Sequence, residues 1–274
     1  MIPLNDGNGI PAVGFGVFKI PPADTEQAVG TALRTGYRHI DTAAMYGNER
    51  ETGRAVAASG VPRDELYLVT KLWNADQGYE STLAAFDASM HRLGIEYLDL
   101  YLVHWPMAQR NKFVDTFKAF AHLRDQGRIR SIGVSNFEPE HLDVLIDATG
   151  IVPAVNQVEL HPRLPQTELR KVHARLGIAT EAWGPLGRGS LLTHPTITGV
   201  AESCGRTPAQ VLIRWHIQLG NIVIPKSVNP KRIASNFDVF DFELSNNDMA
   251  SISSLDDGTD WAPIHEPSTS QAGK

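Results

Sequence analysis

The chain has 274 residues, of which 42% are hydrophobic and 20% are charged, values typical of a globular protein with a full-sized core, which excludes extensive disorder. Its formal net charge of -6 excludes a general nucleic-acid binder, because phosphate backbones attract proteins through clustered surplus Lys and Arg. Cys204 is the only cysteine, so no intrachain disulfide can form and we expect a reducing compartment.

We expect no N-terminal targeting signal. Met1 to Asp6 lack the basic stretch and the long apolar run of a signal peptide. No run of about 20 apolar residues, the length that spans a bilayer, occurs in the sequence. We therefore expect a cytoplasmic protein with no membrane partner.

The chain then alternates short β-rich runs with longer amphipathic stretches, after a hairpin around Asp6-Gly7-Asn8 within residues 2–11. The runs are Ala12–Val17, Arg38–Asp41, Leu66–Lys71, Leu98–His104, Ser131–Ser135, Ala154–Glu159, Ile178–Trp183 and Ile222–Lys226. Strands separated by helices form βαβ units and a parallel sheet, and eight such strands close a barrel. The pattern predicts an α/β fold, a (β/α)8 TIM barrel with an N-terminal β-hairpin and an additional C-terminal helix. A doubly wound open sheet is the alternative.

Two helix starts near the C-terminus are marked by capping residues. Thr207-Pro208-Ala209-Gln210 combines a capping threonine, a first-turn proline and a capping-box glutamine. Ser245-Asn246-Asn247-Asp248 has a related form before the apolar residues of 249–255. The chain contains no obvious linker, so we expect one domain over residues 1–274, with 258–274 as a tail anchored by Trp261.

Polar and aromatic residues collect at the ends of the predicted strands. The residues that close a run are Asp41, Lys71, His104, Ser135, Trp183 and Lys226, and Tyr46 lies in the loop after the second run. Each alone has an ordinary structural explanation, such as a turn cap, a surface charge or a core histidine. An acid, an amine, a phenol and an imidazole at one barrel end are costly to bury unless they pair. Together they predict a catalytic site at the C-terminal rim.

Carbonyl reduction gives a reason for this set of side chains. It needs a hydride on carbon and a proton on oxygen, and a tyrosine with a pKa near ~10 donates slowly unless its neighbours lower that pKa. Lys71 would lower the pKa of Tyr46 by its charge, and Asp41 would keep Lys71 protonated. His104 would orient the substrate oxygen as negative charge develops on it.

Signatures of other enzyme classes fit less well. Residues 67–71 match the Tyr-x-x-x-Lys pair of short-chain dehydrogenases, but that pair needs a helix and this run is a predicted strand. Gly14-Phe15-Gly16 lacks the third glycine of a dinucleotide fingerprint and opens no helix. The sequence has no phosphate-binding Gly-x-x-x-x-Gly-Lys-Ser/Thr run and no His-Glu-x-x-His metal motif.

The same residues lie in motifs that resemble the signature of the aldo-keto reductases, in order, from about Leu4 to about Leu255. The motifs are Gly36-Tyr37-Arg38-His39-Ile40-Asp41-Thr42-Ala43, Tyr46-Gly47-Asn48-Glu49, Thr70-Lys71-Leu72-Trp73, Asp99-Leu100-Tyr101-Leu102-Val103-His104-Trp105-Pro106, Gly133-Val134-Ser135-Asn136-Phe137, Val155-Asn156-Gln157-Val158-Glu159-Leu160-His161-Pro162 and Ile224-Pro225-Lys226-Ser227. Residues 17–22 and 183–187 are similar to bacterial reductases of the 2,5-diketo-D-gluconate type.

This resemblance implies an NADPH-dependent reductase of aldehydes, ketones and dicarbonyls, expected to be a monomer, with Asp41, Tyr46, Lys71 and His104 as its catalytic tetrad. It implies that Ser135, Asn136 and Gln157 bind the nicotinamide carboxamide and that Trp183 stacks on the ring. The loop with Gly184, Leu186 and Gly187 would cover the pyrophosphate. The 2′-phosphate of NADPH would be bound by Lys226, Ser227 and Arg232, near a short helix that begins at Asn229-Pro230. Asn236 would contact the adenine.

Substrate identity remains open in the sequence. Phe18, Trp73, Trp105 and Trp261 are the expected walls of the substrate pocket, and Arg110, Lys112 and Arg188 are either ligands for an anionic sugar acid or surface charges. Two other functions are compatible with the fold: a cofactor-bound regulatory subunit without turnover, and an isomerase or lyase acting on a phosphosugar.

Overall fold

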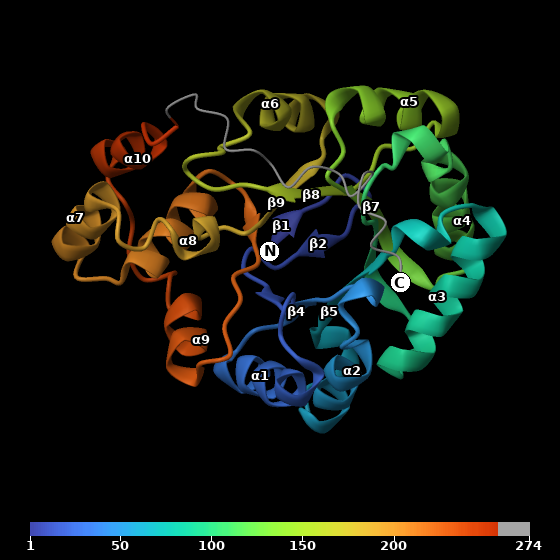
Figure 1. The fold of residues 1–274 in the computed structure, drawn as a ribbon, viewed down its shortest axis with the longest axis horizontal. Coiled ribbons are helices and arrows are strands. Elements are labelled where there is room, and N and C mark those ends of the chain that lie inside the picture. Colours follow the sequence, from blue (N-terminus) through green and yellow to red (C-terminus); the bar gives the residue numbers. More distant parts are fainter. Residues whose placement is uncertain (257–274) are drawn as a thin grey trace.

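Eight parallel strands form the centre of the computed structural model, which describes residues 1–256 (Figure 1). In sheet order the strands are β3 (Phe15–Gly16), β4 (His39–Asp41), β5 (Tyr67–Leu72), β6 (Leu98–Val103), β7 (Ile129–Ser135), β8 (Val155–Glu159), β9 (Ala179–Trp183) and β10 (Ile222–Val223). A parallel bridge between Val13 and Val223 joins the first and last strands. The backbone N–H of Gly14 donates to the Val223 carbonyl at 2.9 Å there. The sheet is therefore closed, which confirms the predicted barrel and rules out the open sheet.

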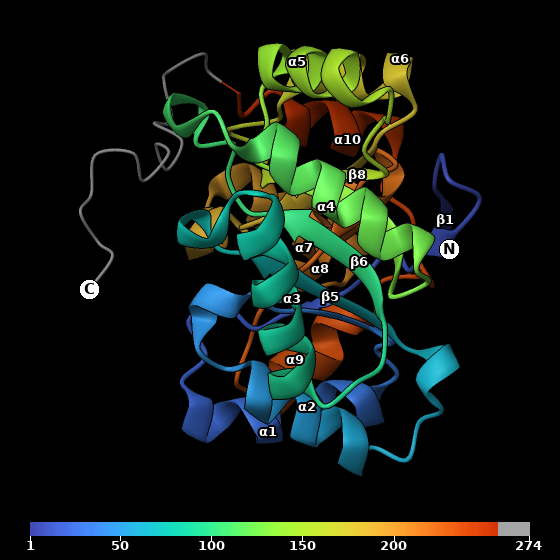
Figure 2. The ribbon, with the colours of Figure 1, turned by 90° about the vertical axis from the view of Figure 1, so that its right-hand side faces the viewer.

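Helices surround the barrel on its outer side (Figures 1 and 2). The six that connect successive strands are α1 (Pro22–Thr35), α2 (Glu49–Ala58), α3 (Tyr79–Leu93), α4 (Phe113–Asp125), α5 (Pro139–Thr149) and α6 (Thr167–Leu176). Two more, α7 (Pro195–Cys204) and α8 (Pro208–Gln218), connect β9 to β10, and α9 (Pro230–Phe237) and α10 (Asn246–Ser253) follow. Helix α10 confirms the predicted additional helix. None of the described helices is both long enough and apolar enough to cross a membrane.

Short 3-10 turns lie in the loops: η1 (Ala44–Tyr46), η2 (Arg63–Glu65), η3 (Asn74–Asp76), η4 (Ala108–Arg110) and η5 (Gly187–Gly189). Both predicted capping boxes are present. Thr207 accepts from the backbone N–H of Gln210, and Ser245 accepts from that of Asp248. The eighth strand is shorter than predicted and ends at Val223 rather than Lys226. Pro225 has no N–H to continue the ladder, although its carbonyl accepts from Gly16 N at 3.2 Å.

The barrel interior is apolar at one end and polar at the other. The predicted hairpin is present, with β1 (Ile2–Pro3) paired antiparallel to β2 (Gly9–Ile10), and Figure 2 shows it at one end of the barrel. Leu4 and Ile10 of this hairpin segment pack with inward side chains of the strands, including Val69 and Leu102, in one buried cluster. The hairpin therefore closes the N-terminal end, and the C-terminal strand ends are left to hold the polar groups.

Candidate active site

A buried ion pair forms the base of the candidate site. Lys71, on β5, donates from Nζ to Oδ1 of Asp41, the last residue of β4, at 2.6 Å. The Thr42 carbonyl accepts a second hydrogen bond from the same Nζ at 3.0 Å, and the Tyr46 hydroxyl a third at 3.4 Å. Lys71 is only 1% exposed, so these three acceptors compensate for the water it has lost. The predicted Asp–Lys–Tyr group is thus assembled from the adjacent strands β4 and β5 and from the loop that follows β4.

The loop that carries Tyr46 is fixed by Asn48. Thr42 Oγ1 donates to Asn48 Oδ1 at 3.0 Å, and Asn48 Nδ2 donates to the carbonyls of Val17 and Ile20 at 3.1 and 3.2 Å. The 3-10 turn η1 ends at Tyr46. Because the amide of Asn48 is fully buried and bonded on both sides, it holds this turn against the chain that follows β3.

His104 completes the predicted tetrad directly after β6. Its ring makes edge contacts with the rings of Tyr46, at a centroid distance of 5.8 Å, and Trp73, at 5.3 Å. Burial, aided by the charge of Lys71, lowers the pKa of His104 well below its usual value. The imidazole is therefore neutral at physiological pH, with one nitrogen able to donate a hydrogen bond to a substrate oxygen.

The electrostatics of Tyr46 correct one sequence-based expectation. Lys71 does act to lower the Tyr46 pKa, as predicted, but burial acts more strongly in the opposite direction, and the net pKa of Tyr46 is raised. For Lys71, burial alone would lower the pKa, but Asp41 and Tyr46 outweigh it and the net pKa is raised. The lysine is therefore firmly protonated beside a neutral phenol, because both groups lie in a water-poor interior.

The residues expected at the nicotinamide lie together within or directly after β7, β8 and β9. Ser135 Oγ donates to the Gln157 carbonyl at 2.8 Å. Asn136, in a left-handed conformation with φ 61°, donates from Nδ2 to the His104 carbonyl and accepts from Trp183 Nε1 at 2.9 Å. The structure thus brings these four residues into one network next to the tetrad.

Gln157 also reaches two carboxylates inside the barrel. Its Nε2 donates to Asp41 Oδ2 at 2.9 Å and to Glu181 Oε2 at 2.8 Å. Glu181 in turn lies 3.4 Å from Nε2 of His39. His39 and Glu181 are not among the site residues predicted from the sequence. The alternation of side chains between the two faces of a strand could have indicated them. His39 therefore shares the inward face with Asp41, and Glu181 shares it with Trp183.

The glycine-containing loop after β9 is fixed to β8 by an arginine. Gly184 and Gly187 have positive φ values of 63° and 56°, and Leu186 precedes the 3-10 turn η5. Arg188 donates to both carboxylate oxygens of Glu159, at 2.6 and 2.9 Å. The loop therefore follows a tight path across the end of the barrel, which Gly184 and Gly187 permit at no steric cost.

The residues expected at the 2′-phosphate surround the start of α9. The predicted helix start is present, because Asn229 Oδ1 accepts from the backbone N–H groups of Lys231 and Arg232 at 3.0 and 3.2 Å. Those two backbone N–H groups are thus already hydrogen-bonded, so an anion bound here would have to be held by side chains. Lys226 and Arg232 are exposed and form no ion pair with a described residue. Ser227 directly follows Lys226, and Asn236 lies one helical turn after Arg232. Both Ser227 and Asn236 are largely buried.

Aromatic residues border the tetrad, as predicted for the substrate pocket. Phe18 packs on Tyr46 with ring centroids 4.9 Å apart, and Trp73 contacts His104. Trp105 is partly buried and its carbonyl accepts from Gln77 Nε2 at 2.7 Å. Trp261 lies outside the described residues.

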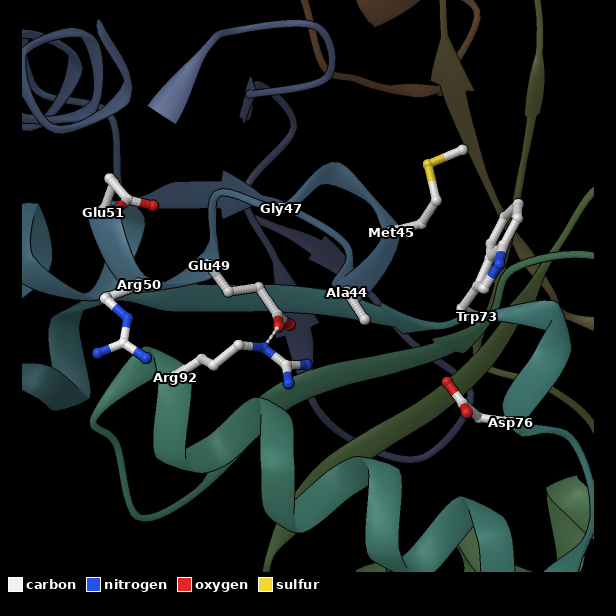
Figure 3. A pocket seen from close by; sticks show the side chains of 9 residues that line it. All are labelled: Ala44, Met45, Gly47, Glu49, Arg50, Glu51, Trp73, Asp76 and Arg92. Atoms are coloured by element: carbon white, nitrogen blue, oxygen red, sulfur yellow. Dashed lines mark hydrogen bonds and ion pairs between the residues drawn. The ribbon is translucent and has the colours of Figure 1, made fainter. Parts of the chain in front are cut away.

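A cavity of about 390 Å³ opens beside this aromatic wall (Figure 3). Met45 and Trp73 lie at one end of it, and Arg50 lies at the other (Figure 3). Glu49 and Arg92 also line it, and Glu49 accepts from Arg92 Nε at 2.6 Å. None of the tetrad residues lines this cavity, so it adjoins the predicted reaction site but is separate from it.

Comparisons with known proteins agree with this geometry. The Aldo/keto reductase family profile matches residues 9–257. An aldo-keto reductase of Mycolicibacterium smegmatis is 75% identical over 262 residues, covering 96% of this chain and 95% of that protein.

Solved structures show the same likeness. The structure of a mutant of Gox0644 in complex with NADPH is 50% identical with a TM-score of 0.90, covering 93% of this chain and 92% of that one. The Bombyx mori aldo-keto reductase in complex with NADP is 37% identical with a TM-score of 0.87, covering 93% and 92% of the two chains. The profile, the relatives and the assembled strand-end residues lead to one conclusion: the chain belongs to the aldo/keto reductase family.

Proposed function

We propose that the protein reduces a carbonyl compound with NADPH and that Tyr46 is the general acid. The observation that carries the proposal is the position of Lys71 Nζ, which lies 2.6 Å from Asp41 Oδ1 and 3.4 Å from the Tyr46 hydroxyl. A protonated amine in this position stabilises the phenolate that forms when tyrosine gives up its proton.

NADPH, when bound, supplies the hydride that reaches the carbonyl carbon. Tyr46 then donates the proton from its hydroxyl to the carbonyl oxygen, which yields the alcohol, and the phenolate is reprotonated from solvent. Lys71 holds its positive charge beside the phenolate, and Asp41 keeps that charge in place. Neutral His104 donates a hydrogen bond to the substrate oxygen and so fixes its direction.

The residues of the proposed cofactor site fit NADPH in their chemistry. Gln157 turns Nε2 toward the barrel interior, which leaves Oε1 to accept from the carboxamide NH2. Ser135, Asn136 and Trp183 supply further polar groups and an aromatic face. The exposed cations Lys226 and Arg232, which form no ion pair within residues 1–256, suit the extra phosphate that distinguishes NADPH from NADH. The glycine-containing loop that includes Gly184, Leu186 and Gly187 would cover the pyrophosphate, and Asn236 would contact the adenine.

The substitution Tyr46→Phe tests the role of Tyr46. It deletes the proton donor but no proposed cofactor contact, so we expect near-complete loss of carbonyl reduction with NADPH affinity preserved in a fluorescence titration. Tyr79→Phe, which removes the hydroxyl of an exposed tyrosine on α3, serves as the matched control. Near-normal turnover by Tyr46→Phe contradicts the mechanism. NADPH binding by the wild-type protein without turnover supports the regulatory subunit, and no binding at all supports the phosphosugar isomerase or lyase.

Small aldehydes and vicinal dicarbonyls are the proposed substrates. The residues around the tetrad are aromatic, and apolar walls discriminate weakly among substrates, by about 1 to 3 kcal/mol per methylene. Arg188 and Arg110, the candidate ligands for an anionic sugar acid, already bind Glu159 and the Asn74 carbonyl. A panel of carbonyl compounds tests this assignment. Much faster reduction of one keto-sugar acid than of every simple aldehyde contradicts it, supports a 2,5-diketo-D-gluconate type of activity, and makes Lys112 the next residue to mutate.

The proposed enzyme is a cytoplasmic monomer formed by one domain over residues 1–274. The proposed tetrad and cofactor residues all come from one chain, so no second copy is needed to complete the site. The single cysteine suits a reducing compartment. Analytical ultracentrifugation checks the oligomeric state, and a stable dimer at low concentration contradicts it.

A further inference from the structure

The barrel interior beneath the tetrad contains two ionisable side chains that the proposed reaction does not use. His39 on β4 and Glu181 on β9 are both 0% exposed, and Nε2 of His39 lies 3.4 Å from Oε1 of Glu181. Among the described residues, neither of these two atoms has a hydrogen-bond partner in good geometry. Buried polar atoms are rarely left unsatisfied. A single proton between the two side chains would satisfy both.

The surrounding charges favour one proton on this pair. Asp41 and Lys71 already compensate each other, and Gln157 Nε2 bridges Asp41 and Glu181. If Glu181 were ionised, two carboxylates would share one amide in a water-poor interior. The titratable and charged groups that act on the pair are Asp41 of the same strand as His39, and Lys71, Tyr46 and Tyr67 from neighbouring elements.

Burial places the proton on the carboxyl group rather than on the ring. It raises the pKa of Glu181 to about 8, and the charge of Asp41 acts in the same direction. It lowers the pKa of His39 to about 4, which the charge of Asp41 only partly opposes. At neutral pH the pair is therefore a carboxylic acid facing a neutral imidazole, and the interior carries no net charge.

The imidazole is held in place by its packing. A Cβ added to Gly14 would lie 2.5 Å from Nδ1 of His39, so only glycine leaves room for the ring. Tyr67 packs against the ring in an edge contact, with centroids 5.4 Å apart. His39 therefore keeps its Nε2 close to Glu181 Oε1, at 3.4 Å.

We propose that Glu181 is a positioning residue for the cofactor: as a neutral acid held by His39, it fixes the Gln157 amide so that Oε1 faces the barrel mouth. This inference rests on the proposed function, in which that oxygen accepts from the nicotinamide carboxamide. The influence is electrostatic and geometric, because an amide between two acids donates hydrogen bonds but does not relay a proton. Ionised Glu181 adds negative charge that raises the pKa of Tyr46 further.

Infrared spectroscopy of the cofactor-free protein tests the protonation state. We expect the carbonyl band of a protonated carboxylic acid at neutral pH, its loss as the pH rises past about 8, and its absence in Glu181→Gln. Glu168→Gln, which removes an exposed glutamate of α6, is the matched control and should retain the band. Absence of the band in the wild type, or its persistence in Glu181→Gln, overturns the proposal. This measurement needs no NADPH, so it is independent of the proposed function.

NADPH titrations by fluorescence, at several pH values, test the positioning role. A glutamine at position 181 imitates the protonated acid, since its oxygen accepts from Gln157 and its NH2 donates to His39. We expect wild-type affinity in Glu181→Gln near neutral pH. Between about pH 7 and about pH 9.5 we expect a loss of about tenfold in the wild type and none in this variant.

Glu181→Leu puts an apolar side chain of broadly similar size in this place and removes the acceptor. We expect it to bind NADPH about tenfold more weakly at every pH, because Gln157 loses one of the two partners that orient it. Thermal unfolding of each variant shows whether the barrel is folded before the titrations are interpreted. An identical pH dependence in the wild type and Glu181→Gln, or undiminished affinity in folded Glu181→Leu, overturns the positioning role. If the wild type does not bind NADPH, the proposed function fails while the infrared result still stands.

Discussion

At the scale of single residues, the tightest constraint is the ion pair between Lys71 and Asp41. Both side chains are almost fully buried, so removing either one leaves an uncompensated charge in the interior. We expect Lys71→Met to lower the free energy of unfolding by about 3 to 5 kcal/mol. The paired substitution Asp41→Asn with Lys71→Met should recover part of that loss. Urea unfolding of both single variants and the double variant measures this coupling, and strict additivity of the losses argues against a direct interaction.

A second residue-scale prediction concerns cofactor choice. Arg232 and Lys231 are adjacent exposed cations on α9, but only Arg232 belongs to the proposed phosphate site. Charge-assisted hydrogen bonds contribute about 1.5 to 3 kcal/mol, so Arg232→Ala should weaken NADPH binding roughly ten- to a hundredfold. NADH binding should change little, and Lys231→Ala should change neither. Equal losses for NADPH and NADH in Arg232→Ala would assign the arginine a structural role instead.

At the scale of elements, two helical glycines differ in their surroundings. In α2, a Cβ at Gly53 would overlap the Leu93 carbonyl at the end of α3, whereas a Cβ at Gly199 in α7 meets nothing within 4 Å. Gly53→Ala should therefore force α2 and α3 apart, at a cost of about 1 to 3 kcal/mol. Gly199→Ala should instead stabilise α7 by about 0.5 to 1 kcal/mol. Thermal unfolding of the two variants checks the opposite signs, and stabilisation by both would contradict the close crossing of α2 and α3.

The helices, strands and site residues differ in how far the sequence alone could predict them. The eight strands, the hairpin and both capping boxes follow from local patterns. The proximity of Asp41, Tyr46, Lys71 and His104 does too, because strand ends in a parallel barrel all face one rim. The weaker predictions depend on tertiary context. The direction of the Tyr46 pKa shift depends on how deeply its hydroxyl is buried, which no local motif specifies. Glu181 lies far from Asp41 and Gln157 in sequence, and only barrel closure places it beside them. Arg188 likewise resembles a surface charge until Glu159 is seen beneath it.

At the scale of the whole molecule, several buried histidines make the fold sensitive to acid. Burial lowers the pKa of His161 and His173 to about 4 and that of His216 to about 3. In the unfolded chain each would titrate near ~6.5, so the unfolded state binds more protons at pH values between these limits. Stability therefore falls as the pH drops from about 6.5 toward about 4, by up to about 1.4 kcal/mol per pH unit for each histidine.

Urea unfolding over a series of pH values measures this slope. The slope of unfolding free energy against pH reports how many more protons the unfolded state binds. We expect His173→Gln to lower that number by one, whatever its effect on stability at neutral pH. His122 is exposed, and His122→Gln should leave the slope unchanged. A slope that is the same in His173→Gln and the wild type would show that His173 does not contribute to the acid sensitivity.

The pairing of the first and last strands, β3 and β10, which closes the barrel, has a consequence for how the protein folds during synthesis. Each strand from β4 to β9 pairs with its neighbours in the chain, so these pairs can form one after another as the ribosome delivers them. The bridge from Val13 to Val223 must wait until nearly the whole barrel has left the exit tunnel. Until then the edges of β3 and of the newest strand are unpaired and open to other nascent chains. Translation that pauses before Ile222 should therefore lengthen the time in which the growing chain depends on chaperones.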